Sequence, residues 1–228
     1  MCGIAGCFGI QDEKTVDRML DAMTHRGPDD RGIHVHSCGV FGHTRLSIVD
    51  VAGGHQPILA DGGEIGIICN GEIYNFHEHR NWLRAKYRFE TKSDSEVALH
   101  LYREKGPESV KELDGMFAFA IFDGDNYLLA RDPIGIKPLY YGYVDERLYF
   151  ASELGAMSLA GVQLVHEFPA GHYYTPKEGF VQYYSVPEVQ EHLITDFEEA
   201  SHLIRRTFLW LVIKRLLAAK VFPGCVNF

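Results

Sequence analysis

The second residue of the chain is a cysteine, in the opening Met1-Cys2-Gly3. Cysteine is small enough for a preceding initiator methionine to be removed, which would leave Cys2 with a thiol and a free α-amine on one residue. Such an amine has a pKa of about 7.7–8.0, so part of it is unprotonated near neutral pH. A thiol with its own base is an activated nucleophile that needs no distant histidine. Cys2 therefore predicts acyl-transfer chemistry, with an incidental cysteine at a frayed terminus as the alternative.

A candidate for stabilising an oxyanion is Asn70-Gly71, which follows a strand-like run over residues 64–69. At the end of a strand, this pair can present a backbone N–H and a side-chain amide in one direction, the usual composition of an oxyanion hole. Asn-Gly is also the strongest short signal of a type I′ hairpin turn. The residues that follow lead into a predicted helix and not into a returning strand, which weakens the hairpin interpretation.

Two charged residues could hold the two ends of an α-amino acid. Arg45 lies among apolar residues of a predicted strand, where a guanidinium is costly to bury without a partner and suits bidentate carboxylate binding. Asp94 lies at a predicted helix start, where it either complements the helix dipole or pairs with a ligand ammonium. A solvent-facing Arg45 and a dipole-complementing Asp94 are the alternatives without a ligand.

The elements that must position these residues are read from the hydrophobic pattern. We expect strands over 3–9, 64–69, 116–123, 127–131, 139–143, 148–152, 172–175 and 180–185, with short β-runs within 32–51. We expect helices over 16–23, 76–87, 94–105 and 195–217. Ser93 with Glu96 resembles a capping box for the third helix, and Thr195 is the expected cap of the last. This order of elements favours an α+β fold with antiparallel sheets over a parallel α/β fold.

Composition limits the classes of protein and of site. The chain has 228 residues, of which 46% are hydrophobic and 23% charged, and its 22 Lys+Arg against 31 Asp+Glu give a net charge of −9. The acidic balance and the lack of a basic run argue against nucleic acid, and no apolar stretch is long enough to span a membrane. The five cysteines are irregularly spaced and form no C-x-x-C, so neither a disulfide framework nor a zinc site is expected. Reduced thiols and the absence of a signal peptide predict a cytoplasmic location.

A series of short sequence blocks lies in order over residues 2–171. The first group comprises Met1-Cys2-Gly3-Ile4-Ala5-Gly6, His25-Arg26-Gly27-Pro28-Asp29, Arg45-Leu46-Ser47-Ile48-Val49-Asp50, Gly54-His55-Gln56-Pro57, Asn70-Gly71-Glu72-Ile73-Tyr74-Asn75 and Ser93-Asp94. These blocks resemble the class II glutamine amidotransferase family. The second group comprises Asp114-Gly115-Met116-Phe117-Ala118-Phe119-Ala120, Ala130-Arg131-Asp132-Pro133-Ile134-Gly135-Ile136-Lys137-Pro138-Leu139-Tyr140, Ala151-Ser152-Glu153 and Phe168-Pro169-Ala170-Gly171. It is similar to the glutamine-hydrolysing asparagine synthetase branch of that family.

The resemblance implies a fold and a reaction. The fold is the four-layer αββα sandwich of N-terminal nucleophile hydrolases, with two antiparallel sheets between helices. The Cys2 thiolate would attack the side-chain amide of glutamine, and Asn70 and Gly71 would hold the oxyanion and contact the substrate. Ammonia would leave, and water would release glutamate from a γ-glutamyl thioester. The resemblance implies that this glutaminase step uses no metal and no cofactor.

The resemblance also implies how L-glutamine is bound. Arg45 would hold its α-carboxylate and Asp94 its α-ammonium. Glu72 would line the same pocket. Ile48 and Val49 would contact the substrate through their backbone.

The C-terminus departs from the family pattern. In the asparagine synthetase branch, a helix ending near residue 216 leads into a synthetase domain that binds ATP and Mg and carries a Ser-Gly-Gly-x-Asp-Ser loop, whereas this chain has no such loop. We therefore expect a glutaminase domain over residues 1–190 and the helical start of a synthetase domain over residues 191–228. A frameshift, a truncation and a split enzyme remain open explanations.

Several alternatives of function and partner remain open after this step. In the full enzyme, ammonia would reach an ATP-activated aspartate, which is asparagine biosynthesis. Glucosamine-phosphate synthase or phosphoribosylamine chemistry is the alternative within the family. A non-catalytic remnant that binds glutamine or a partner is the alternative outside it. The partners to consider are a separate synthetase chain and a second copy in a homodimer.

Overall fold

The computed structural model describes all residues except 49, 189–193, 195 and 220–228, and it does not describe the side chains of residues 216–219. The chain divides into two compact units, Met1–Ser185 and Val186–Phe228. The predicted domain boundary between residues 190 and 191 falls outside the described residues and stays a prediction. Within the described part of the chain, no helix combines the length and apolar character that a membrane span needs.

The first unit contains two antiparallel sheets of six strands each. In spatial order, the first sheet consists of β10 (His166–Glu167), β8 (Tyr140–Val144), β9 (Arg147–Ala151), β1 (Gly3–Phe8), β3 (Gly39–Arg45) and β2 (Asp30–His36). The second consists of β12 (Gly179–Gln182), β11 (His172–Thr175), β7 (Asn126–Arg131), β6 (Gly115–Asp123), β5 (Ile65–Ile73) and β4 (Ile58–Ala60). The predicted α+β class with antiparallel sheets is confirmed.

The core lies between the two sheets and is rich in aromatic rings. Phe8 and Phe41 of the first sheet share a buried cluster with Phe122 of the second. The rings of Phe41 and Phe122 are stacked, with centroids 4.3 Å apart. All six residues of β1 are buried, as expected for a central strand that is covered on both faces.

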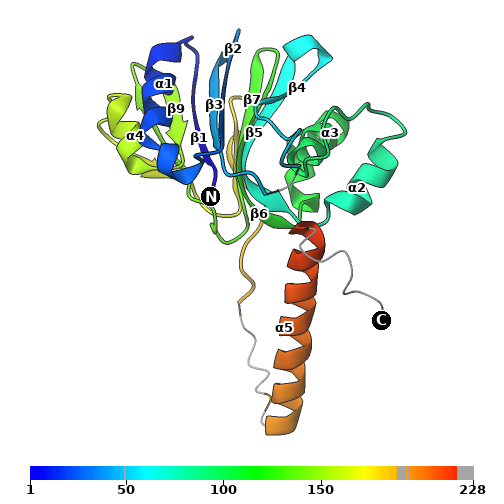
Figure 1. Ribbon diagram of the computed structural model, residues 1–228. Coiled ribbons are helices and arrows are strands. Elements are labelled where there is room, and N and C mark those ends of the chain that lie inside the picture. The colour runs from blue at the N-terminus through cyan, green and yellow to red at the C-terminus, as the bar shows by residue number, and fades with distance from the viewer. Residues whose placement is uncertain (49, 189–193, 195, 220–228) are drawn as a thin grey trace. The chain divides into compact units, whose positions relative to one another are not determined.

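Helices cover the outer faces of both sheets (Figure 1). α1 (Glu13–Ala22) and α4 (Leu154–Leu159) pack against the first sheet, while α2 (Phe76–Leu83) and α3 (Ser95–Lys105) lie beside the second. The buried side chains of α1, such as Met19 and Leu20, join a cluster with Cys7 of β1. Their spacing is the helical period that the sequence displays. The four-layer αββα arrangement is therefore confirmed.

Several elements differ from the sequence predictions. The helix predicted over 76–87 ends at Leu83, and α4, β4 and β10 were not predicted because they are too short for a clear periodic pattern. Gly106 ends α3 with a φ of 66°, a left-handed conformation that glycine adopts readily. The predicted end of this helix at residue 105 is therefore confirmed.

The second unit contains the helix α5 (Phe197–Ala219). The predicted cap, Thr195, lies outside the described residues. Asp196 caps the first turn instead, since its Oδ1 accepts a hydrogen bond from the Glu199 N–H at 2.8 Å. Large apolar side chains of α5 are exposed, including Phe208 at 65% and Trp210 at 58%.

Candidate active site

One pocket in the first unit brings together the predicted site residues that the structure describes. They are Cys2, Arg45, Ile48, Asn70, Gly71, Glu72 and Asp94. The remaining predicted residue, Val49, lies outside the described residues. In the β1–β3 pair Gly3 is opposite Thr44, so Cys2 and Arg45 lie side by side at the same end of these two neighbouring strands. Ile48 comes from the segment that follows β3, and the other residues come from β5 and the start of α3.

The Cys2 thiol is held by the backbone of the segment that follows β3. Its S–H donates to the Leu46 carbonyl at 3.6 Å, and the Leu46 N–H donates to the sulfur at 3.4 Å. The Arg26 Nε–H donates to the Cys2 carbonyl at 2.9 Å, and Arg26 is in turn paired with Glu153 at 3.0 Å. Sulfur and backbone of Cys2 are therefore both fixed at the pocket.

Burial raises the pKa of the Cys2 thiol above its ordinary value. The Leu46 hydrogen bond opposes this effect, as do the N-terminal ammonium, Arg45 and Lys137. A buried thiol remains protonated until a base takes its proton. The chemistry of this site therefore needs both a base and a positive field beside Cys2.

Asn70-Gly71 forms neither a hairpin turn nor the end of a strand. β5 continues through Ile73, with Asn70 opposite Ala118 and Gly71 opposite Phe117 of β6. The expectation of a strand ending at residue 69 is wrong because β6 continues alongside and pairs with these residues. Glycine is required at position 71, since an added Cβ would lie 2.4 Å from the Met116 oxygen.

The Gly71 N–H is directed to the open edge of β5. The side-chain amide of Gln56 binds both backbone polar groups of Cys69. It accepts a hydrogen bond from the Cys69 N–H at 2.6 Å and donates one to the Cys69 carbonyl at 3.2 Å. The Asp94 Oδ2 accepts from the Ile73 N–H at 2.7 Å. In an antiparallel strand, alternate residues direct their N–H groups to the same side. The Gly71 N–H therefore points to the same edge of β5, between the Cys69 backbone bound by Gln56 and the Ile73 N–H bound by Asp94.

The side-chain amide of Asn70 is the second donor at this edge. Asn70 is only 1% exposed, and its Nδ2 has no hydrogen-bond partner among the described residues. An unsatisfied buried donor costs about 1–3 kcal/mol, so such a group normally has a purpose. Asn70 and Gly71 thus offer two donors to a ligand atom in the pocket that contains Cys2.

Arg45 is buried and holds the segment that follows β3. Its Nη2–H donates to the Asp50 carbonyl at 2.7 Å and its Nη1–H to the Val51 carbonyl at 3.2 Å. Ile48, in the same segment, is 60% exposed at the pocket. The alternative of a solvent-facing Arg45 is wrong. Its guanidinium both lines the pocket and shapes the wall that carries Ile48.

Asp94 stands at the N-cap position of α3, but its side chain does not cap the helix. Its carboxylate is buried and bound to the Ile73 N–H. Burial raises the pKa of Asp94 above its usual value, while hydrogen bonds, that of Ile73 first, oppose the rise. No ion pair joins Asp94 to a cation of the described residues, and a buried carboxylate in this state suits a ligand ammonium.

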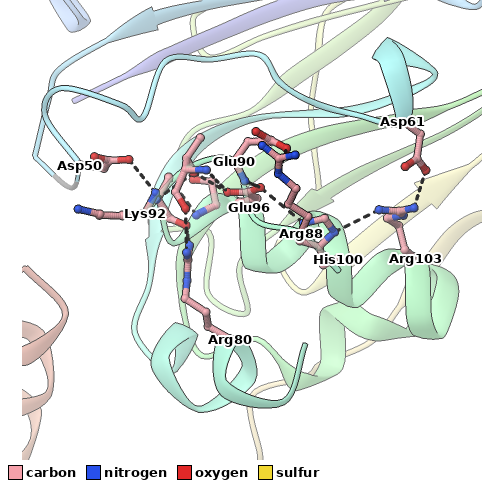
Figure 2. A network of polar contacts seen from close by, with 12 residues as sticks. Asp50, Asp61, Arg80, Arg88, Glu90, Lys92, Glu96, His100 and Arg103 are labelled. Carbon is pink, nitrogen blue, oxygen red and sulfur yellow. Dashed lines mark hydrogen bonds and ion pairs between the residues drawn. The ribbon is translucent and has the colours of Figure 1, made fainter. Parts of the chain in front are cut away.

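A polar network holds the segment that leads into Asp94 (Figure 2). The Glu96 carboxylate accepts hydrogen bonds from the Glu90 N–H at 2.7 Å and the Thr91 N–H at 2.8 Å, and Arg80 donates to the Thr91 carbonyl at 2.8 Å. The predicted capping box is wrong, because Glu96 binds these amides while the Ser93 N–H is bound to the Thr91 hydroxyl.

The same network reaches the segment that Arg45 holds. The Lys92 N–H donates to Asp50 Oδ2 at 2.7 Å (Figure 2). Asp50 has a φ of 50°, and its carbonyl accepts from Arg45. The two segments that border the pocket are therefore joined at Asp50.

Sequence reasoning did not name several residues of the pocket as site residues. They are Met1, Leu46, Gly54, Gln56, Cys69, Ser93, Ser95, Met116 and Lys137. Gln56 and Lys137 lie within the sequence blocks, but spacing alone did not indicate that either residue lines the pocket that contains Cys2. Among the described residues, no group of three or more His, Cys, Asp or Glu side chains is placed to hold a metal ion.

Sequence comparison places the chain among known proteins. A family model described as a glutamine amidotransferase domain matches residues 1–167. Asparagine synthetase B (glutamine-hydrolyzing) of Escherichia coli (strain K12) is 43% identical over 192 residues, which cover 81% of this chain and 34% of that protein. Asparagine synthetase (glutamine-hydrolyzing) 3 of Arabidopsis thaliana is 39% identical over 225 residues, 95% of this chain and 39% of that protein. The chain thus spans between 34% and 39% of the length of these relatives.

Solved structures share the fold. Glutamine phosphoribosylpyrophosphate amidotransferase from B. subtilis, complexed with ADP and GMP, superposes with a TM-score of 0.67 at 23% identity, covering 79% of this chain and 48% of that one. A structure described as the allosteric regulatory enzyme of purine biosynthesis gives a TM-score of 0.68 at 24% identity, covering 78% and 48%. The predicted fold and the resemblance to the asparagine synthetase branch are confirmed. The chain belongs to the class II glutamine amidotransferase family, with asparagine synthetases among its relatives.

Proposed function

We propose that the chain hydrolyses L-glutamine to glutamate and ammonia through a covalent intermediate on Cys2. One observation carries the proposal: the Cys2 thiol shares its pocket with the Asn70 Nδ2 group, which has no hydrogen-bond partner in the described part of the chain. A nucleophile beside preorganised donors is the arrangement that stabilises a tetrahedral oxyanion. The buried Arg45 and Asp94 in the same pocket supply opposite charges for the two ends of an α-amino acid.

The reaction starts once Met1 is removed, so that the α-amine of Cys2 serves as base. The amine takes the thiol proton, and the resulting thiolate bonds to the side-chain carbonyl carbon of glutamine. The carbonyl oxygen becomes an oxyanion, which the Asn70 amide and the Gly71 N–H stabilise. Collapse of this intermediate breaks the C–N bond, and the proton passes from the amine to the leaving nitrogen. Ammonia departs, and a γ-glutamyl thioester remains.

Hydrolysis of the thioester completes the turnover. The α-amine takes a proton from water as the water oxygen bonds to the thioester carbonyl carbon. The C–S bond then breaks, the proton returns to sulfur, and glutamate leaves. No group outside the pocket enters these steps, so we expect glutaminase activity to survive treatment with EDTA. The chemistry requires a reduced thiol, in keeping with a cytoplasmic location.

In this proposal, recognition of glutamine rests on groups that the pocket already orients. The Arg45 guanidinium takes the α-carboxylate and the Asp94 carboxylate takes the α-ammonium. Glu72 completes the wall beside Gly71, and the backbone of Ile48 borders the exposed side. A backbone contact of Val49 with the substrate stays a prediction. Bidentate binding by arginine fixes direction as well as position.

The acceptor of the ammonia is the second part of the proposal. The relatives are named asparagine synthetases, which supports delivery of ammonia to an ATP-activated aspartate on a synthetase domain, where ATP and Mg would bind. That domain would be on another polypeptide or on a longer form of this protein. The phosphoribosylpyrophosphate amidotransferases support only the fold.

The test is covalent labelling with a glutamine analogue that carries a diazoketone, followed by peptide mass spectrometry. We expect one adduct, on Cys2, and loss of both labelling and glutaminase activity in Cys2→Ala. Cys38→Ala is the matched control, because Cys38 is a partly exposed free cysteine away from the pocket, and it should keep both. Labelling that persists in Cys2→Ala would overturn the assignment. Absence of turnover together with binding of glutamine would favour the non-catalytic remnant.

A further inference from the structure

Lys137 places a buried positive charge in the pocket. The residue is only 6% exposed and lines the same pocket as Cys2 and Cys69. Lysine is almost never buried to this extent unless a partner compensates its charge. The position of this ammonium therefore calls for an explanation.

The backbone of Lys137 is fixed by a second buried group. Its N–H donates to Asp132 Oδ2 at 2.9 Å, and its carbonyl accepts from the Arg131 Nε–H at 2.8 Å. Asp132 is fully buried, and its other oxygen accepts from the Ile136 N–H at 2.9 Å. These bonds use the carboxylate of Asp132 for backbone amides, so the segment before β8 presents Lys137 from a rigid base.

Among the residues that the structure describes, the Lys137 ammonium has no anionic partner. Over the described residues, no hydrogen bond or ion pair joins Lys137 Nζ to a protein group. By contrast, the nearby Arg131 guanidinium pairs with Glu167 at 2.7 Å. A buried cation that faces a pocket and lacks a protein anion is suited to an anion that forms in the pocket during the reaction.

We propose that Lys137 supplies the positive field that stabilises negative charge at the reacting end of the glutamine pocket. The inference rests on the proposed glutaminase function. Three anions arise there in turn: the Cys2 thiolate, the tetrahedral oxyanion and the γ-carboxylate of the product glutamate. The neutral side-chain amide of glutamine gains nothing comparable, so the charge favours the thiolate and the transition state over the bound substrate.

The same charge has a cost after hydrolysis. Glutamate and glutamine share the α-carboxylate and the α-ammonium, so Arg45 and Asp94 do not distinguish them. They differ at the side chain, where glutamate carries a carboxylate and glutamine a neutral amide. A cation at the reacting end therefore strengthens the binding of product relative to substrate. Removal of the Lys137 charge should weaken inhibition by glutamate more than it weakens binding of glutamine.

Other charges around Cys2 must be separated from Lys137. The cations are the N-terminal amine, Arg45 and Arg26, of which Arg26 is paired with Glu153. The acidic and thiol groups of the pocket are Glu72, Asp94 and Cys69. Since a cation favours the deprotonated thiol, loss of Lys137 should shift the titration of Cys2 to higher pH. The remaining groups stay in place in a Lys137 variant, so they cannot cause that shift.

The primary test measures the thiol without glutamine. The alkylation rate of Cys2 by iodoacetamide is followed against pH by peptide mass spectrometry, on protein whose intact mass shows removal of Met1. Lys137→Met keeps the length of the side chain and removes the charge. At pH 7 we expect it to lower the Cys2 rate about threefold to tenfold and to move the rate profile to higher pH. Lys137→Arg should restore both, and Lys14→Met, at an exposed lysine, should change neither.

The second test measures inhibition by glutamate during glutaminase turnover. We expect Lys137→Met to raise the inhibition constant of glutamate about threefold to tenfold more than the KM of glutamine. An alkylation profile like that of the unmodified protein in a folded Lys137→Met variant would overturn the proposal. Because alkylation requires no glutaminase activity, that result is distinct from failure of the proposed function. A folded Lys137→Arg variant that does not restore the profile would equally overturn it.

Discussion

At the scale of single residues, one substitution can separate the structural role of Asp94 from its proposed role in recognising glutamine. Its Oδ2 accepts the Ile73 N–H, and its charge faces the pocket. Asp94→Asn keeps an acceptor for that N–H and removes the charge. We expect kcat/KM for glutamine to fall about tenfold to a hundredfold, mainly through KM, with little loss of thermal stability. Steady-state kinetics would show it, and Asp125→Asn, at an exposed aspartate, should leave KM unchanged.

His43 is a second residue with a measurable signature, in this case in stability. It is fully buried, its Nε2 bonds the Cys69 carbonyl at 3.1 Å, and burial lowers its pKa to about 4. The unfolded chain takes up a proton near its ordinary pKa of about 6.5, whereas folded His43 stays neutral. Stability should therefore fall as pH drops from about 6.5 towards 4, by at most about 1.4 kcal/mol per pH unit.

Urea unfolding at pH 7 and pH 5 would measure this loss. His43→Gln keeps a donor for the Cys69 carbonyl and cannot titrate, so it should lose less stability than the original chain between the two pH values. Equal losses in both proteins would assign the acid sensitivity to other groups.

At the scale of elements, the end of β5 is held by side chains where a neighbouring strand is missing. β4 pairs only with residues 65–67 of β5. Beyond that point Gln56 takes the place of a strand, because its side chain binds both the N–H and the carbonyl of Cys69. Gln56→Leu removes that clamp and should displace the Gly71 N–H. We expect kcat for glutamine to fall about tenfold to a hundredfold with little change in KM, since the oxyanion is stabilised only in the transition state.

Alkylation provides a control for the clamp. Iodoacetamide reacts with Cys2 without forming an oxyanion on a carbonyl, so Gln56→Leu should leave that rate near its original value. Gln11→Leu removes another glutamine that binds a backbone carbonyl, that of His36, away from the pocket. It should change neither measurement. Parallel loss of alkylation and turnover in Gln56→Leu would mean that the whole pocket had collapsed.

The segment before α3 depends on Glu96 in a similar way. Its carboxylate accepts hydrogen bonds from two backbone N–H groups, one on each oxygen. Glutamine at this position retains one acceptor oxygen and places an NH2 donor against the other N–H group. We expect Glu96→Gln to lower the free energy of unfolding by about 2–3 kcal/mol and to raise KM, because the segment carries Asp94. Glu90→Gln, at a mostly exposed ion pair with Arg88, should cost less than about 1 kcal/mol in the same chemical denaturation experiment.

At the scale of the whole molecule, the two units should be separable. All the described pocket residues lie within Met1–Ser185, while α5 belongs to the second unit and exposes large apolar side chains. An exposed apolar surface of this kind favours self-association. We expect a chain shortened to residues 1–191 to keep glutaminase activity and to scatter less light at equal concentration. An inactive shortened chain, or an original chain that is monomeric at high concentration, would contradict the prediction.

The fold was largely predictable where the pattern is local. The run of small and apolar residues in β1, the helical spacing in α1 and the Gly-Pro stop after α3 are each visible within about ten residues of sequence. The extent of β5 was not predictable, because Asn70-Gly71 prefers a turn by local chemistry, whereas pairing with β6 holds it extended. The role of Glu96 was missed for a related reason. Its carboxylate binds amides of the preceding segment, and the capping rule considers only the helix start.

The sequence by itself determined the candidates for the nucleophile, for the oxyanion donors and for the two charges that would bind an amino acid, because residue type alone limits which chemistry a side chain can perform. Only the tertiary structure decided how they act together. Leu46 binds the Cys2 sulfur across 44 positions of the chain, and Gln56 and Asp94 reach β5 from 13 and 21 positions away. Lys137 lines the same pocket from the segment that precedes β8. Such convergence depends on how two sheets pack, and no pattern within one segment encodes it.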